Sequence, residues 1–153
     1  MIAQLSPATA LSADYQHFLK ALKASGFRGE ISADYASRVV LATDNSIYQR
    51  LPQAAVFPKD AEDVARVARL IAEPAYQQVV ITPRGGGTGT NGQSLTDGIV
   101  VDLSRHMNRI LEINVEQRWV RVQAGVVKDQ LNAALKSAGL FFAPELSTSN
   151  RAT

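Results

Sequence analysis

Five of the ten glycines in this chain lie within the eight residues from Gly85 to Gly92. Such a cluster needs a structural reason, because glycine loses more conformational freedom on folding than any other residue. Glycine adopts positive φ without steric cost and, lacking a Cβ, lets backbone N–H groups come close to a ligand. Successive N–H groups that turn inward form a concavity that binds anions. We therefore predict that residues 82–94 form a loop that cradles a phosphate or pyrophosphate group. The side chains expected to add charge and hydrogen-bond donors are Arg84, Thr88, Thr90 and Ser94.

The segments on either side of this loop are both predicted strands. A β-branched run at Gln78–Thr82 leads into the loop and Gly98–Leu103 leads out of it. Residues 87–92 match the G-x-G-x-x-G pattern of the Rossmann turn, but that turn must open a helix, and only residues 93–97 precede the next strand. The sequence has neither the Gly-Lys-Ser/Thr of a Walker A loop nor the His-Arg-Asp motif of protein kinases. A strand–loop–strand cradle that holds phosphate through backbone N–H groups is the interpretation that remains, with a loop needed only for chain topology as the alternative.

Composition excludes several classes of function. The chain contains no cysteine, which rules out disulfides, thiolate catalysis, iron–sulfur ligation and thiolate–flavin bonds within it. Its two histidines, His17 and His106, are too few for a histidine-built metal site, and we expect no metal. The basic residues are scattered and the formal net charge is +2, so no nucleic-acid partner is indicated. No stretch approaches the roughly 18 apolar residues of a membrane span, and no secretory leader is evident. We therefore expect no transmembrane segment and a cytoplasmic protein.

The rest of the chain predicts a small domain of helices and strands. Helical spacing of apolar residues follows Ser12, and Ser32 can cap a second, short helix. From residue 54 the pattern becomes that of an α/β unit, with strand, helix and strand in turn. Residues 109–114 and 118–123 are expected to pair as an antiparallel hairpin. The other predicted elements are a first helix that ends near Gly26, the strand Ala54–Phe57, a helix from Asp60 to about Pro74, a helix from Val127 to Ala138 terminated by Gly139, and a short strand Leu140–Phe142.

A series of motifs, taken in order, resembles a known family. The first is Pro83-Arg84-Gly85-Gly86-Gly87-Thr88-Gly89, preceded by the strand at 54–57 and an amphipathic helix. With the motifs that follow, it resembles the FAD-binding domain of the vanillyl-alcohol oxidase and p-cresol methylhydroxylase (PCMH) superfamily over roughly residues 40–153. Within that superfamily the chain is most similar to the D-lactate, glycolate and D-2-hydroxyglutarate dehydrogenase branch, and in particular to the YdiJ-type FAD-linked oxidoreductases. The later motifs are Val101–Arg105, Met107–Ile110, Val122–Val126 and Pro144–Thr153.

The resemblance implies an α+β fold and a noncovalent cofactor. The fold would be the first lobe of a PCMH-type FAD-binding domain, a small mixed sheet with flanking helices, which ends before the second lobe. Residues 1–50 would form an N-terminal helical lead-in and residues 51–153 the lobe itself. FAD would be bound noncovalently, since no cysteine is present and Gly87 and Thr88 occupy the region where covalent members carry a histidine. An iron–sulfur cluster would be confined to a C-terminal region that this chain does not contain.

The function implied by the resemblance is that of a flavoprotein oxidoreductase. It would oxidise a D-2-hydroxy acid, such as D-2-hydroxyglutarate, D-lactate or glycolate, by hydride transfer to flavin. This chain would anchor the FAD pyrophosphate, hold no catalytic residue and be inactive alone, with the small-molecule substrate bound through other domains. A non-catalytic phosphate- or nucleotide-binding module, or an assembly module, is the alternative; the acid used, the electron acceptor and the oligomeric state stay open. The cofactor-binding residues implied are Arg84, Gly85, Gly86, Gly87, Thr88, Gly89, Thr90, Gln93 and Ser94 in the loop and Pro144, Glu145, Ser147 and Thr148 in the tail.

Overall fold

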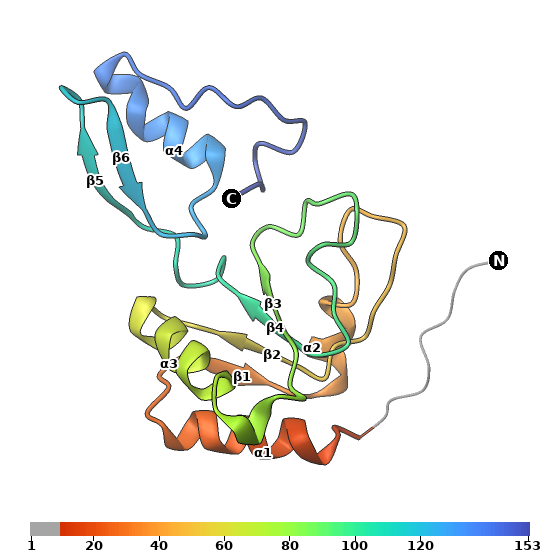
Figure 1. Ribbon diagram of the computed structural model, residues 1–153. Coiled ribbons are helices and arrows are strands. Elements are labelled where there is room, and N and C mark those ends of the chain that lie inside the picture. The colour runs from red at the N-terminus through yellow and green to blue at the C-terminus, as the bar shows by residue number, and fades with distance from the viewer. Residues whose placement is uncertain (1–9) are drawn as a thin grey trace.

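A four-stranded mixed sheet forms the larger part of the molecule (Figure 1). The computed structural model describes residues 10–153, so the first nine residues of the expected lead-in lie outside it. The strand order is β1-β2-β4-β3, with β2, β4 and β3 parallel to one another and β1 antiparallel to β2. This arrangement confirms the predicted α+β fold with a small mixed sheet. The strands are β1 (Glu30–Ser32), β2 (Ala54–Phe57), β3 (Ile81–Arg84) and β4 (Ile99–Asp102).

Helices cover both faces of this sheet. Side chains alternate along a strand, so Ala54 and Val56 of β2 face the main core while Ala55 and Phe57 face the other side. Helices α1 and α3 contribute to the main core, and Leu41, which directly follows α2, packs with Ala55 and Phe57. Because every residue of β2 and β4 is buried, these two strands form a fixed base for the loops at their ends. The helices are α1 (Ala13–Ala24), α2 (Tyr35–Val40) and α3 (Ala61–Ile71), and a single 3₁₀ turn follows at Pro74–Tyr76.

A smaller unit follows the sheet and consists of a hairpin and one helix. Strands β5 (Ile110–Asn114) and β6 (Trp119–Val122) pair antiparallel, which confirms the predicted hairpin. Helix α4 (Lys128–Leu135) continues as a 3₁₀ turn to Ala138 and ends at Gly139, whose φ of 66° bears out its predicted terminating role. The chain then turns back, and its last residues lie between this unit and the glycine loop (Figure 1).

Two predicted strands differ from the structure, and one strand of the sheet was not predicted. The strand expected at Gln78–Thr82 begins only at Ile81 and extends to Arg84, because the Val79 N–H donates to the Tyr76 carbonyl (2.9 Å) and closes a turn instead. The strand expected at Leu140–Phe142 is absent from the described chain. There, the Asn132 side chain accepts from the Phe142 N–H (2.7 Å) and donates to its carbonyl (3.4 Å), in place of a neighbouring strand. Strand β1 was not predicted at all.

Within residues 10–153, no helix is long and apolar enough to cross a membrane.

Candidate anion-binding site

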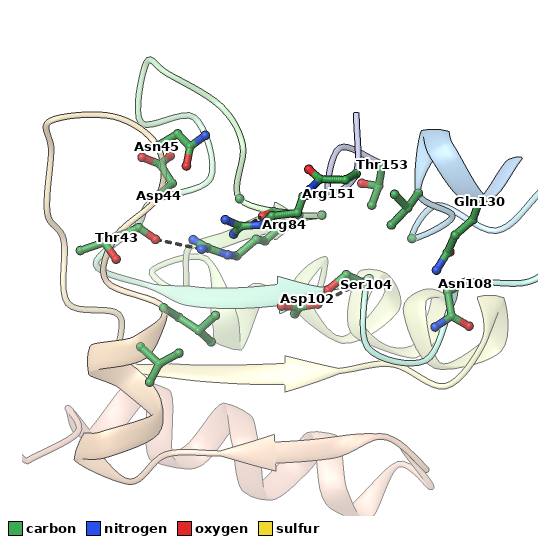
Figure 2. Close-up of a pocket in the computed structure, with 18 residues that line it drawn as sticks. Thr43, Asp44, Asn45, Arg84, Asp102, Ser104, Asn108, Gln130, Arg151 and Thr153 are labelled. Atoms are coloured by element: carbon green, nitrogen blue, oxygen red, sulfur yellow. Dashed lines mark hydrogen bonds between the residues drawn. The ribbon is translucent and has the colours of Figure 1, made fainter. Parts of the chain in front are cut away.

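An open cavity of about 640 Å³ lies at the carboxyl ends of β3 and β4 (Figure 2). Arg84 ends β3, Asp102 ends β4, and the two residues are partners in the parallel register. Ligands of open sheets with parallel strands bind at this edge, outside the carboxyl ends of the strands. The cavity lining comes from the sheet, from α4 and from the tail: Val40, Leu41, Thr43, Asp44, Asn45, Arg84, Gly85, Gly86, Gly87, Asp102, Ser104, Asn108, Gly125, Val127, Gln130, Asn150, Arg151 and Thr153.

The glycines of the loop serve more than one purpose. Gly87 and Gly92 have φ of 64° and 72°, values that favour glycine. A Cβ at Gly87 would also overlap the Arg84 guanidinium, which packs directly against it. At Gly85 and Gly86 the constraint is close approach, since a Cβ would overlap the Thr153 hydroxyl and the Arg151 carbonyl oxygen respectively. The loop therefore lacks side chains where the chain's own tail lies against it.

Five successive backbone N–H groups of the loop have no protein acceptor among the described residues, and those of Gly86 and Gly87 belong to residues that line the cavity. No hydrogen bond among the described residues has as its donor the backbone N–H of Gly86, Gly87, Thr88, Gly89 or Thr90. The Gly87 carbonyl, in contrast, accepts a hydrogen bond from the Asn45 N–H (3.2 Å), which ties the loop to a neighbouring segment. Most backbone N–H groups in a folded protein are paired with protein or water, so a run of five without a protein partner is suited to hold an anion.

The Arg84 side chain is directed into the protein. It is 8% exposed, donates from Nη2 to the Thr43 carbonyl (2.8 Å) and makes a long contact from Nη1 to the Ser94 hydroxyl (3.5 Å). Burial lowers the pKa of the Arg84 guanidinium and nearby Arg151 lowers it further, while Asp102 and Asp44 act in the opposite direction. An arginine in a protein nevertheless stays protonated, so Arg84 is a buried cation beneath the loop.

A second loop, at residues 43–46, forms one wall of the cavity. Asp44 accepts from the Ser46 N–H (2.8 Å) and from the Ser94 hydroxyl (3.0 Å). Burial acts to raise the pKa of Asp44, but the hydrogen bonds from Ser46 and Ser94 and the charge of Arg84 outweigh it and leave the pKa below its usual value. The sequence motifs assigned no role in the site to this segment. The sole signal for a role in the site is the run of polar side chains that directly follows buried Leu41 and Ala42.

The tail reaches the cavity because it caps α4. Val127 precedes this helix and offers no side-chain cap; instead the Lys128 and Asp129 N–H groups donate to the carbonyls of Ala152 (2.9 Å) and Ser149 (3.2 Å). Arg151 Nη2 donates to the Gly86 carbonyl (3.2 Å). These bonds hold the tail across the loop.

The structure brings together some of the residues implied by the resemblance and not others. Arg84, Gly85, Gly86 and Gly87 line the cavity. Five other predicted loop residues lie outside the lining: Thr88, Gly89, Thr90, Gln93 and Ser94. The Gln93 side chain packs against Gly89 and accepts a hydrogen bond from the Asn91 N–H (3.1 Å). The Ser94 side chain is buried next to Arg84.

The tail residues implied by the resemblance also lie outside the lining, which the tail instead reaches with Asn150, Arg151 and Thr153. Pro144, Glu145 and Ser147 are exposed, and Glu145 approaches buried Lys128 at 3.8 Å. The Thr148 carbonyl accepts from the Arg151 and Ala152 N–H groups, both at 2.9 Å, and so makes the turn that presents Arg151.

The far end of the cavity is polar but carries no acid–base pair. Asp102 accepts from both the N–H (2.8 Å) and the hydroxyl (2.7 Å) of Ser104, and the amides of Asn108 and Gln130 lie beyond it (Figure 2). Neither His17 nor His106 lines the cavity. In the part of the chain that the structure describes, no group of three or more His, Cys, Asp or Glu residues is placed to hold a metal ion.

Comparison with known proteins identifies similar sequences and structures. The family model described as an FAD binding domain matches residues 52–153. The chain is 82% identical over its full 153 residues to a D-2-hydroxyglutarate dehydrogenase of Pseudomonas putida and 60% identical over the same length to one of Escherichia coli. It spans 15% of the length of each of these relatives. A solved alkyldihydroxyacetonephosphate synthase matches 98% of this chain and 29% of its own, with a TM-score of 0.77 and 21% identity, which shows a shared fold.

Proposed function

Because this chain belongs to the FAD binding domain family, we propose that its glycine loop holds the pyrophosphate of FAD. The observation that carries this proposal is the run of five N–H groups from Gly86 to Thr90 that have no protein acceptor among the described residues. A pyrophosphate is an anion with several acceptor oxygens, so it matches a row of donors at the edge of a sheet.

The proposed cofactor site has two walls. The loop wall comprises Arg84 to Thr90 with Gln93 and Ser94 as support, and the tail wall comprises Asn150, Arg151 and Thr153, which line the cavity. Residues 144–148, also expected from the sequence, are proposed as the segment that leads the chain toward the cofactor. FAD is proposed to bind noncovalently, because no cysteine is present and no histidine lines the cavity.

We further propose that the chain is part of a dehydrogenase that oxidises a D-2-hydroxy acid. Relatives that are 82% and 60% identical carry the name D-2-hydroxyglutarate dehydrogenase, and the chain corresponds to a small part of each. Bound FAD would supply the hydride acceptor. The residues of this chain would bind and orient the cofactor, and none of residues 10–153 is placed as the base that removes the hydroxyl proton. The cytoplasmic location expected from the sequence remains a proposal.

Titration of FAD, followed by quenching of flavin fluorescence, tests the proposed site. The full-length Pseudomonas putida relative is the positive control. In Gly86→Val the new side chain collides with the Arg151 carbonyl, and we expect affinity to fall by more than about tenfold, or ~1.4 kcal/mol. Gly139→Ala is the matched control: no atom lies within 4 Å of its Cβ and its φ is 66°, so it should cost about 1 kcal/mol of stability without changing FAD affinity.

Two outcomes would contradict the proposed function. If neither the unaltered chain nor the full-length relative quenches flavin fluorescence, the loop does not serve FAD. If phosphate raises the melting temperature of the chain while FAD does not bind, a phosphate- or nucleotide-binding module is the better description. The dehydrogenase role is tested by dye reduction with D-2-hydroxyglutarate, for which we expect turnover by the full-length relative and none by this chain alone.

A further inference from the structure

We propose that the two arginines of the cavity have separate roles: Arg84 positions the glycine loop from inside the protein, and Arg151 is the cation that contacts the bound phosphate. This inference rests on the proposed function, since it assigns the residue that meets the pyrophosphate. The two side chains approach each other from opposite walls, Arg84 from the end of β3 and Arg151 from the tail (Figure 2).

The hydrogen bonds of Arg84 all go to groups of the protein itself, although Thr43 also lines the cavity. Its Nη2 donates to the Thr43 carbonyl (2.8 Å), its Nη1 approaches the Ser94 hydroxyl (3.5 Å), and the plane of the guanidinium lies against Gly87. Ser94 in turn donates to Asp44 (3.0 Å). One side chain therefore joins the end of β3, the 43–46 loop and the return of the glycine loop. With 8% of its surface exposed, it has little left to offer a ligand.

The charge of Arg84 is also balanced within the protein. The carboxylates of Asp102 and Asp44 both act on it, so the positive charge beneath the loop is offset by two negative ones. A cation whose field is offset in this way attracts an added anion less than a cation without such neighbours.

Arg151 has the opposite environment. It is exposed and lines the cavity, and it forms no ion pair with any carboxylate in residues 10–153. One of its N–H groups donates to the Gly86 carbonyl (3.2 Å), and the guanidinium carries five donors, so most remain available. This bond places the guanidinium beside the row of free N–H groups.

The proximity of the two cations also favours an anion between them. Arg151 lowers the pKa of Arg84, which is the effect of one positive charge on another. A phosphate bound beside Arg151 would relieve this repulsion. Because Arg84 is held by the Thr43 carbonyl and Arg151 is exposed, Arg151 is the one free to adjust to the ligand.

The test compares Arg84→Met and Arg151→Met in this chain, with Arg69→Met as a control that removes one exposed charge from α3, remote from the cavity. Two quantities are measured: the melting temperature without ligand, and the FAD dissociation constant at low and at high salt. For Arg151→Met we expect an unchanged melting temperature. FAD affinity should fall about tenfold, as for the loss of a charge-assisted hydrogen bond, and should depend less on salt than in the unaltered chain. For Arg84→Met we expect a lower melting temperature and weaker FAD binding with the salt dependence of the unaltered chain.

A purely structural role for both arginines would not change the salt dependence in either variant, and that result would overturn the inference. It would also be overturned if Arg84→Met, rather than Arg151→Met, weakened the salt dependence. If Arg84→Met does not fold, Arg84→Lys replaces it, because lysine keeps the charge and one donor for the Thr43 carbonyl; its salt dependence should again match the unaltered chain.

The same variants separate this inference from the proposed function. If the unaltered chain binds inorganic pyrophosphate, seen as a rise in melting temperature, but not FAD, the proposed cofactor is wrong and the roles of the arginines are tested with pyrophosphate. If neither this chain nor the full-length relative binds FAD or pyrophosphate, both the proposed function and the role of Arg151 are wrong.

Discussion

The sheet unit (β1–β4 with α1–α3) and the hairpin–helix unit (β5, β6 and α4) each place one wall of the same cavity, but their cores differ in size. Among residues 10–153, twelve buried residues form the core on one face of the sheet and four more lie on the other face, whereas three buried residues form the core beneath α4. Buried apolar area is the main stabilising term of a fold. The glycine loop therefore starts from a well-packed base, while the tail depends on a lightly packed one.

The two main helices of these units also begin in different ways. Asp60 caps α3 with its own side chain, which accepts from the Glu62 and Asp63 N–H groups, both at 3.1 Å. Helix α4 is capped by carbonyls of the tail. The first N–H groups of α3 are therefore capped by a side chain of the same segment, whereas the start of α4 and the position of the tail over the cavity depend on each other.

The largest expected effect comes from the two cores. Phe18 is fully buried and meets the Tyr76 ring edge-on, with centroids 5.3 Å apart, so Phe18→Ala should cost about 3–5 kcal/mol. Leu131→Ala in the small core should cost about 2 kcal/mol, because that core can collapse around the gap. Urea unfolding followed by circular dichroism measures both. Equal losses with a single shared transition would show that the two units unfold as one.

An intermediate effect is expected from the caps. Asp60→Ala should cost about 1 kcal/mol, the usual value for a lost side-chain cap. Val127→Ser gives α4 a side-chain cap that competes with the Ser149 carbonyl for the Asp129 N–H, so the tail should loosen while overall stability changes by only a few tenths of a kcal/mol. The Arg151 and Ala152 amides donate to the Thr148 carbonyl, so their rate of hydrogen exchange measures how often the tail opens. Unaltered protection of these amides would show that the tail does not depend on the α4 cap.

The smallest expected effect concerns pH. Hydrogen bonds from Arg105 and His106 hold the pKa of Glu30, in β1, below its usual value. A carboxyl whose pKa is lowered by folding stabilises the protein above its unfolded pKa, about 4.3, and this contribution is lost as the pH falls through the folded value. Glu30→Gln should therefore lower the melting temperature slightly at pH 7 and not near pH 2, with Glu116→Gln in the hairpin turn as control. An effect of equal size at both pH values would contradict this electrostatic origin.

Local sequence patterns predicted most of the elements that nearby residues decide. The strand–glycine loop–strand order, the hairpin, the existence of the helices and the end of α4 at Gly139 follow from periodicity or the φ of glycine. The predicted cap of the second helix was wrong: Asp34 caps α2, and Ser32 lies in β1. Strand β1 has three residues and exists through its pairing with β2, so its own sequence carries little signal. The strand expected at Leu140–Phe142 did not form, because the side chain of Asn132, ten positions before Phe142, makes the hydrogen bonds that a neighbouring strand would have made.

The sequence by itself determined that residues 82–94 form a glycine-rich loop between two strands, since the requirement for positive φ is local; that the loop binds an anion is our proposal. Only the tertiary structure decided what surrounds that loop. Asp44, 40 positions before Arg84, and Arg151, 67 positions after it, reach the same cavity through a sheet pairing and a helix cap that depend on the whole fold. The direction of the Arg84 side chain has the same origin: its partner is the Thr43 carbonyl, and a contact between segments so far apart in the chain leaves no trace in either one alone.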